Sequence, residues 1–150
     1  MVKSAATNDE KMPLNREYRN HKIPEIASCP YIQTLYDIVR PNDDTTDPPH
    51  LIFEWMDLDL RSVPAARFRG DPKLPKVVSK AVLSALKVFK KLNTVHTGNG
   101  KSASVKIPRT KLLDVNINNV YVSDIEGSSP IAKLGDLGNF KCSSYLRSRC

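Results

Sequence analysis

The pattern of apolar and polar residues predicts one long helix over residues 75–92. Apolar residues recur there every three or four positions, and five lysines lie mostly away from them. The apolar stripe of this predicted helix comprises Val78, Ala81, Val82, Ala85, Leu86, Phe89 and Leu92. We expect a helix that packs on the core with one face and presents a basic face to water.

Shorter apolar runs predict strands. Residues 31–39 alternate between apolar and polar, and residues 51–56 read as a buried strand that runs out into polar residues. Two further strands are expected at 119–123 and 131–134, with the turn at 124–130 joining them into a hairpin. A hairpin brings the outer ends of its two strands together.

The remaining segments carry weaker signals. Residues 14–26 are consistent with a helix that Pro24 ends, whereas the small and polar residues 4–13 predict a loop. The proline-rich segment 41–50 predicts a turn-rich loop, and residues 57–75 show no regular pattern. Together these elements indicate an α+β fold.

Composition is that of one average domain. A chain of 150 residues with 40% hydrophobic residues can bury a moderate core. It contains no apolar run of membrane-spanning length, which argues against a membrane protein, and its first residues do not form a signal peptide. Its cysteines, Cys29, Cys142 and Cys150, are odd in number and lack metal-ligand spacing. This predicts reduced thiols in an intracellular protein of the cytoplasm or nucleus.

The net charge of +7 raises the question of a nucleic-acid surface. Residues 98–113 alone contribute four basic residues and no acid, and without them the charge would fall to +3. No aromatic residue interleaves with the basic residues of that segment. The distribution therefore argues against a nucleic-acid partner.

One constellation of polar residues indicates a chemistry. Asp114 lies five residues before Asn119, an apolar run follows, and Asp136 comes seventeen residues after Asn119 in an Asp-x-Gly sequence. Enzymes that transfer phosphoryl groups arrange a base and two magnesium ligands in this order. Magnesium prefers oxygen ligands and keeps several waters, so one carboxylate and one amide oxygen suit it. The competing interpretation is that both aspartates are turn residues and that Asn119 begins a strand.

The sequence Asp114-Val-Asn-Ile-Asn-Asn119 resembles the catalytic loop of eukaryotic protein kinases, in particular of kinase-like proteins from filamentous fungi. Asp136-Leu-Gly138 resembles their Asp-Phe-Gly motif. The resemblance implies transfer of a phosphoryl group from ATP to serine or threonine of a protein substrate, with Mg2+ as cofactor. Asp114 would be the catalytic base, and Asn119 and Asp136 would be the metal ligands.

A second stretch resembles the fifth strand and hinge of the same family. It reads Leu51-Ile-Phe-Glu-Trp-Met-Asp-Leu-Asp59. By this resemblance Phe53 is the gatekeeper residue. The backbones of Glu54 and Met56 would contact adenine, and Asp59 would contact the ribose. Trp55 is expected to pack in the core or at the hinge.

The resemblance extends to the beginning of the chain. Lys3 is placed like the lysine of the third strand that contacts phosphate, and Glu17 like its partner in the C helix. The fold implied is protein-kinase-like. Residues 1–60 would form part of the small β-rich lobe up to the hinge, and residues 61–150 the start of the helical lobe.

Four departures from the family predict weak or absent catalysis. No Gly-x-Gly-x-x-Gly loop precedes Lys3, Asn116 replaces the catalytic-loop lysine, Leu112-Leu113 replace His-Arg, and no activation segment follows Gly138. The alternative is a non-catalytic pseudokinase that binds a protein partner through the apolar stripe of residues 75–92. That stripe is expected to have few helical partners, which would lower stability.

Residues 98–113 interrupt the resemblance. Without them His96-Thr97 would directly precede Asp114, which gives a better match to the family's catalytic loop. Two origins of the segment are open: a retained intron that is translated, and a genuine surface insertion. Residues 141–150 raise the same question. The sequence of the transcript distinguishes the two origins.

Overall fold

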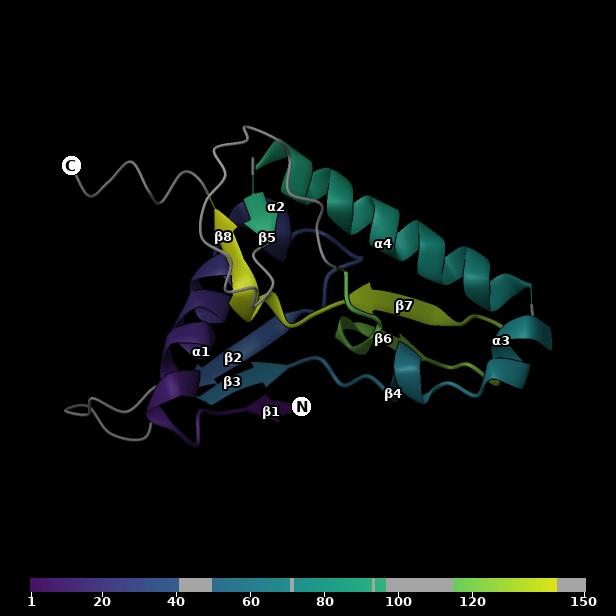
Figure 1. Cartoon of the computed structure of the whole chain (residues 1–150), viewed down its shortest axis with the longest axis horizontal. Helices are drawn as coiled ribbons and strands as arrows, with labels where there is room; N and C mark the ends of the chain where they lie inside the picture. Colours follow the sequence, from purple (N-terminus) through teal and green to yellow (C-terminus); the bar gives the residue numbers. More distant parts are fainter. Residues whose placement is uncertain (41–49, 71, 93, 97–114, 143–150) are drawn as a thin grey trace, which may run out of the picture.

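The computed structural model describes residues 1–40, 50–70, 72–92, 94–96 and 115–142 (Figure 1). The helices in these ranges are α1 (Asn8–His21), α2 (Pro24–Ala27), α3 (Ala65–Gly70) and α4 (Lys73–Lys91). The strands are β1 (Val2–Lys3), β2 (Leu35–Val39), β3 (His50–Phe53), β4 (Leu58–Asp59), β5 (Thr94–His96), β6 (Val120–Ser123), β7 (Ile131–Leu134) and β8 (Phe140–Cys142). Short 3-10 turns cover Leu60–Ser62, Ile117–Asn119 and Leu137–Asn139. These elements form an α+β fold, which confirms the fold class predicted from the sequence.

The first sheet has the antiparallel order β1-β3-β2, and α1 packs beside it (Figure 1). Leu14 of α1 forms a small buried core with Leu51 and Phe53 of β3. Full burial of a side chain of this size stabilises the fold by roughly 1.5–3 kcal/mol. This core fixes α1 against the strand that leads into the predicted hinge.

Helix α1 begins inside the segment 4–13, which was predicted to be a loop. Glu10 explains the early start, because its Oε2 accepts hydrogen bonds from the backbone N of Ala6 at 2.7 Å and of Thr7 at 3.2 Å. These bonds satisfy backbone groups at the helix start that would otherwise lack partners. The predicted end of the helix is also wrong, since Pro24 opens the separate helix α2.

The second sheet has the antiparallel order β4-β6-β7, and α4 lies along it (Figure 1). The long predicted helix is confirmed, with its ends within two residues of the predicted ones. Its buried residues share one core with the inward side chains of β6 and β7. These residues are Leu74, Val78, Ala81, Ala85 and Phe89 of the helix, and Val120, Val122, Ala132 and Leu134 of the sheet. The stripe was expected to have few helical partners, and the structure shows that the second sheet covers most of it instead.

The hairpin of β6 and β7 is confirmed, with Val120 opposite Leu134 in the register. Its turn contains Asp124, whose φ of 54° lies in the left-handed region. Aspartate adopts this region more readily than most residues. The backbone N of Gly127 donates to the carbonyl oxygen of Asp124 at 3.1 Å and closes the turn.

Two predicted segments differ from the structure. Only the second half of the predicted strand 31–39 forms β2. Its first half instead bonds to β7, where Gln33 N donates to Leu134 O at 2.8 Å and Leu134 N donates to Tyr31 O at 2.9 Å. These two bonds join the two sheets. Residues 57–75, for which no regular structure was predicted, contain β4, a 3-10 turn, α3 and the first turn of α4.

Two expectations from composition can be compared with the described residues. None of the helices there is long and apolar enough to cross a bilayer. Cys29 is a half-buried free thiol, as predicted for that residue. Residue 150 lies outside the described part of the chain.

Candidate functional site

Three charged side chains from distant parts of the sequence meet at one point. Lys3 Nζ of β1 lies 2.6 Å from Glu17 Oε2 of α1 and 2.6 Å from Asp136 Oδ1, which follows β7. The Glu17 side chain is only 2% exposed, whereas those of Lys3 and Asp136 are each 34% exposed. The structure therefore brings together three of the residues that the resemblance selected, with the lysine and one carboxylate open to solvent.

The charges in this cluster influence one another's ionisation. Burial alone would lower the pKa of Lys3, but the negative charges of Glu17 and Asp136 outweigh it and raise the pKa above its usual value. Burial raises the pKa of Glu17, and the attraction of Lys3 opposes this only in part. The direction for Lys3 follows from one cation shared by two carboxylates, and the direction for Glu17 follows from its burial. Lys3 remains a cation, with a half-exposed carboxylate beside it.

The backbone at Asp136 holds its side chain toward Lys3. Asp136 has φ 51° and ψ 63°, a left-handed conformation at the start of the turn Leu137–Asn139. Gly135 precedes it in a crowded position, because a Cβ there would lie 2.6 Å from Tyr121 Cε2 and 2.7 Å from Gln33 Oε1. Glycine is therefore the residue that fits before Asp136.

Helix α1 anchors the turn that follows Asp136. Asn20 Nδ2 donates to Leu137 O at 2.7 Å and to Phe140 O at 3.3 Å, and Arg16 donates to Gly138 O at 3.2 Å. A Cβ added to Gly138 would lie 3.1 Å from the carbonyl oxygen of Pro13, so the turn and the helix are in close contact. The helix that carries Glu17 thus also fixes the Asp-Leu-Gly segment.

Asn119 lies beside this cluster, at the end of the 3-10 turn that precedes β6. The backbone N of Gly135 donates to Asn119 O at 2.8 Å, which places Asn119 next to the residue preceding Asp136. The predicted convergence of the two hairpin ends is therefore present at the level of the backbone. The described residues contain no cluster of three or more His, Cys, Asp or Glu side chains suited to a metal ion. One carboxylate and one amide oxygen, supplemented by phosphate oxygens and water, remain a donor set that suits Mg2+.

Asp114, the predicted catalytic base, lies outside the described residues, as does the whole segment 98–113.

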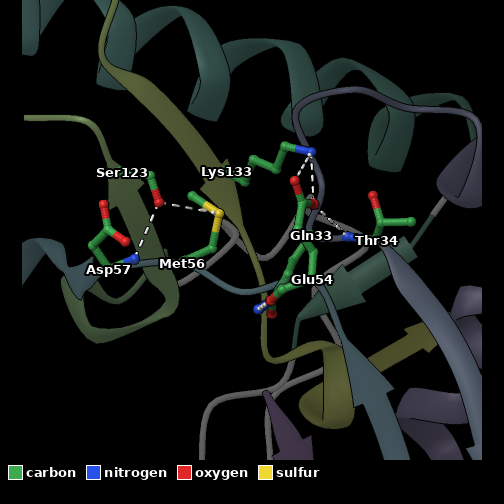
Figure 2. A network of polar contacts seen from close by, with 7 residues as sticks. All are labelled: Gln33, Thr34, Glu54, Met56, Asp57, Ser123 and Lys133. Atoms are coloured by element: carbon green, nitrogen blue, oxygen red, sulfur yellow. Dashed lines mark hydrogen bonds and ion pairs between the residues drawn. The ribbon is translucent and has the colours of Figure 1, made fainter. Parts of the chain in front are cut away.

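The predicted hinge is held by the side chain of Glu54 (Figure 2). Its carboxylate accepts hydrogen bonds from Lys133 Nζ of β7 at 2.7 and 2.8 Å and from Thr34 N at 3.2 Å. Burial would raise the pKa of Glu54, but the hydrogen bonds from Lys133 and Thr34 reverse this and hold it below its usual value. Glu54 is therefore an anion that ties the segment after β3 to the second sheet.

The hinge residues that follow Glu54 lie against β6. Asp57 N donates to Ser123 Oγ at 3.1 Å and to Val122 O at 3.2 Å, and the Ser123 hydroxyl also contacts Met56 Sδ at 3.8 Å (Figure 2). Trp55 is 70% exposed, so the prediction that it packs in the core or at the hinge is wrong.

Asp59 has a structural role of its own. Its Oδ1 accepts a hydrogen bond from Ser62 N at 2.7 Å and caps the 3-10 turn Leu60–Ser62. The hydrogen bond from the Ser62 side chain, followed by those from the backbone, lowers the pKa of Asp59. Asp59 is therefore a half-exposed anion whose carboxylate is bonded to the turn that follows it.

Sequence reasoning missed Gln33, Tyr121 and Lys133. Tyr121 and Lys133 are direct neighbours across β6 and β7, on the face opposite the buried residues of the hairpin. Burial raises the pKa of the Tyr121 phenol, and the charge of Asp136 raises it further. The charges of Lys3, Glu17 and Asp59 also act on this phenol, and its ring lies beside Gly135, the residue that precedes Asp136. The alternation of apolar and polar residues along the predicted hairpin could have identified its outward-facing positions. It could not have identified the residues from other elements that contact them.

No family model matches this chain, and a search of curated proteins finds no match. The functional conclusion therefore depends on the residues and geometry described above.

Proposed function

We propose that this chain binds Mg-ATP in a site of the protein-kinase type, with the base at the hinge around Glu54 and Met56 and the phosphates at the cluster of Lys3, Glu17 and Asp136. The observation that carries the proposal is the contact of Lys3 with both carboxylates. A cation held by a buried carboxylate and facing an exposed one is suited to bind phosphate oxygens beside a metal ion.

Each residue has a distinct role in this proposal. Glu17 orients Lys3, whose ammonium group would neutralise charge on the phosphates. Asp136 and Asn119 would hold Mg2+, which offsets the charge that develops on the transferred phosphoryl group. Asp114 would accept the proton of a serine or threonine hydroxyl on a protein substrate, as the resemblance implies. Positioning and electrostatics supply most of the rate in such reactions, so the replacement of the catalytic-loop lysine by Asn116 and of His-Arg by Leu112-Leu113 predicts slow transfer.

Thermal unfolding with and without Mg-ATP tests the binding step. A ligand at 100 times its Kd stabilises the folded state by about 2.7 kcal/mol, and 1 kcal/mol corresponds to roughly 2–4 °C for a domain of about this size. We expect a rise in Tm of several degrees at millimolar Mg-ATP. No rise in Tm would contradict the proposal.

A pair of aspartate variants sharpens the same measurement. Asp136→Asn retains a side chain that tolerates the left-handed backbone but removes the charge, so the shift with Mg-ATP should be lost. Asp124→Asn is the matched control, because Asp124 has a similar positive φ but lies in the hairpin turn. If both variants respond to Mg-ATP as the parent chain does, Asp136 is not a metal ligand.

A second assay distinguishes an enzyme from a non-catalytic nucleotide-binding protein. Incorporation of labelled phosphate into a generic basic protein would support phosphoryl transfer, and binding without incorporation would support a pseudokinase. Most of the apolar stripe of α4 packs on the second sheet, which weighs against the alternative in which a protein partner binds that stripe.

A further inference from the structure

The peptide groups of Glu54 already have partners inside the protein. Its backbone N donates to Thr34 O at 2.9 Å, and its carbonyl oxygen accepts from Gln33 Nε2 at 3.0 Å (Figure 2). The proposed function assigns this carbonyl to the edge of the purine base. In this chain the carbonyl oxygen already accepts a hydrogen bond from the Gln33 side-chain amide.

Gln33 is fixed in place and is not a mobile surface residue. It is 2% exposed, and its own backbone N donates to Leu134 O at 2.8 Å. Its Oε1 lies 2.7 Å from the point that a Cβ on Gly135 would occupy, so the absence of a side chain at Gly135 makes room for it. The amide therefore lies between the hinge backbone and the residue that precedes Asp136.

The chemistry of an amide differs from that of a bare carbonyl. A carbonyl oxygen only accepts, so it favours the 6-amino group of adenine and disfavours the 6-oxo group of guanine. The Gln33 amide has a second Nε2 hydrogen that can donate and an Oε1 that can accept. It can therefore satisfy either base at the six-position.

We propose that Gln33, and not the Glu54 carbonyl alone, determines base specificity, so that the site accepts both ATP and GTP. This inference rests on the proposed nucleotide-binding function. It assigns to Gln33 a role in specificity and leaves the chemistry at Lys3 and Asp136 as proposed.

The test is the ratio of the dissociation constants for Mg-ATP and Mg-GTP, measured by titration calorimetry on the 150-residue chain. We expect the two constants of the parent chain to agree within about threefold, well under the tenfold that 1.4 kcal/mol represents. Gln33→Leu exposes the Glu54 carbonyl, and the ratio should then shift by about tenfold or more in favour of ATP.

Lys133→Met is the matched control. It breaks the ion pair with the Glu54 side chain but leaves the bond from Gln33 to the Glu54 carbonyl, so both affinities should fall together and their ratio should stay the same. Circular dichroism verifies that each variant is folded. Gln33→Met replaces Gln33→Leu if the shorter side chain prevents folding.

Two results would overturn the inference. One is a parent chain that prefers ATP by more than about tenfold, and the other is an unchanged ratio in a folded Gln33 variant. Binding of ATP without GTP leaves the proposed function intact and refutes only the role of Gln33. Binding of neither nucleotide refutes both.

Discussion

Protonation of His21 should destabilise the folded chain in acid. His21 is 5% exposed at the end of α1, and its ring lies edge-on to Phe53 with centroids 5.1 Å apart. Burial, together with the positive charge of Lys3, lowers its pKa from 6.5 to about 4. Between these values the unfolded chain takes up a proton at His21 that the folded protein does not. Stability from this residue is therefore complete above pH 6.5 and declines as the pH falls toward 4.

The size of the effect follows from the shift in pKa. Each unit corresponds to about 1.36 kcal/mol, so a displacement from 6.5 to about 4 removes about 3 kcal/mol of unfolding free energy. The total free energy of unfolding of a small domain is only about 5–15 kcal/mol. Glu17 acts in the opposite direction, because its raised pKa gives stability at low pH that is lost as the pH rises through the folded-state value.

Urea unfolding followed by circular dichroism at pH 7, 6, 5 and 4 measures this dependence. His21→Leu removes the titrating ring, so the difference in unfolding free energy between the parent chain and this variant should change by about 3 kcal/mol over the range. The contribution of Glu17 is common to both proteins and cancels in the difference. Phe53→Leu is the control, since it alters the same ring contact and should keep the parent's dependence on pH. Parallel curves for the parent chain and His21→Leu would refute the reasoning.

Three further predictions concern stability and are measured by urea unfolding at pH 7. Lys3→Met should lower the free energy of unfolding by about 3 kcal/mol, because it leaves the buried Glu17 carboxylate without its cation. Adding Glu17→Gln should recover part of this loss, and equal stabilities of the single and double variants would contradict the prediction. Gly135→Ala should lower the free energy of unfolding by about 1–3 kcal/mol, since the new methyl group would overlap the ring of Tyr121. An unchanged midpoint of urea unfolding would show that the ring moves freely. Phe89→Ala should lower the free energy of unfolding by about 3–5 kcal/mol, because this ring of α4 is fully buried. A loss below about 1 kcal/mol would mean that α4 does not pack as described.

The elements that sequence predicts best are those whose pattern is local. The apolar stripe of α4 repeats over several turns, and the hairpin of β6 and β7 has apolar alternation on both sides of a polar turn. The start of α1 was missed because residues 4–13 are polar and small. The helix depends on the cap that Glu10 provides and on contacts with distant strands. Neither of these can be predicted from the spacing of apolar residues.

The candidate site is predictable only in part for the same reason. No local pattern relates Lys3 to Asp136, and their association was expected only through the resemblance to a family. Gln33 lies in a stretch that was predicted to be an ordinary strand. Its role follows from a hydrogen bond to Glu54 and from the space beside Gly135, which requires the pairing of the two sheets to be known.

The anchoring of α1 by the Asp-Leu-Gly turn has a consequence for biosynthesis. Asn20 of α1 bonds to Leu137 O, 117 residues later, and Lys3 bonds to Asp136, 133 residues later. The first helix and strand therefore leave the ribosome long before the Asp-Leu-Gly turn that contacts them has been synthesised. Closing so large a loop is slow, and contacts of this range usually form late in folding. We expect α1 to pack on the first sheet early, and its surface toward the Asp-Leu-Gly turn to remain open to chaperones and proteases until translation has passed residue 140.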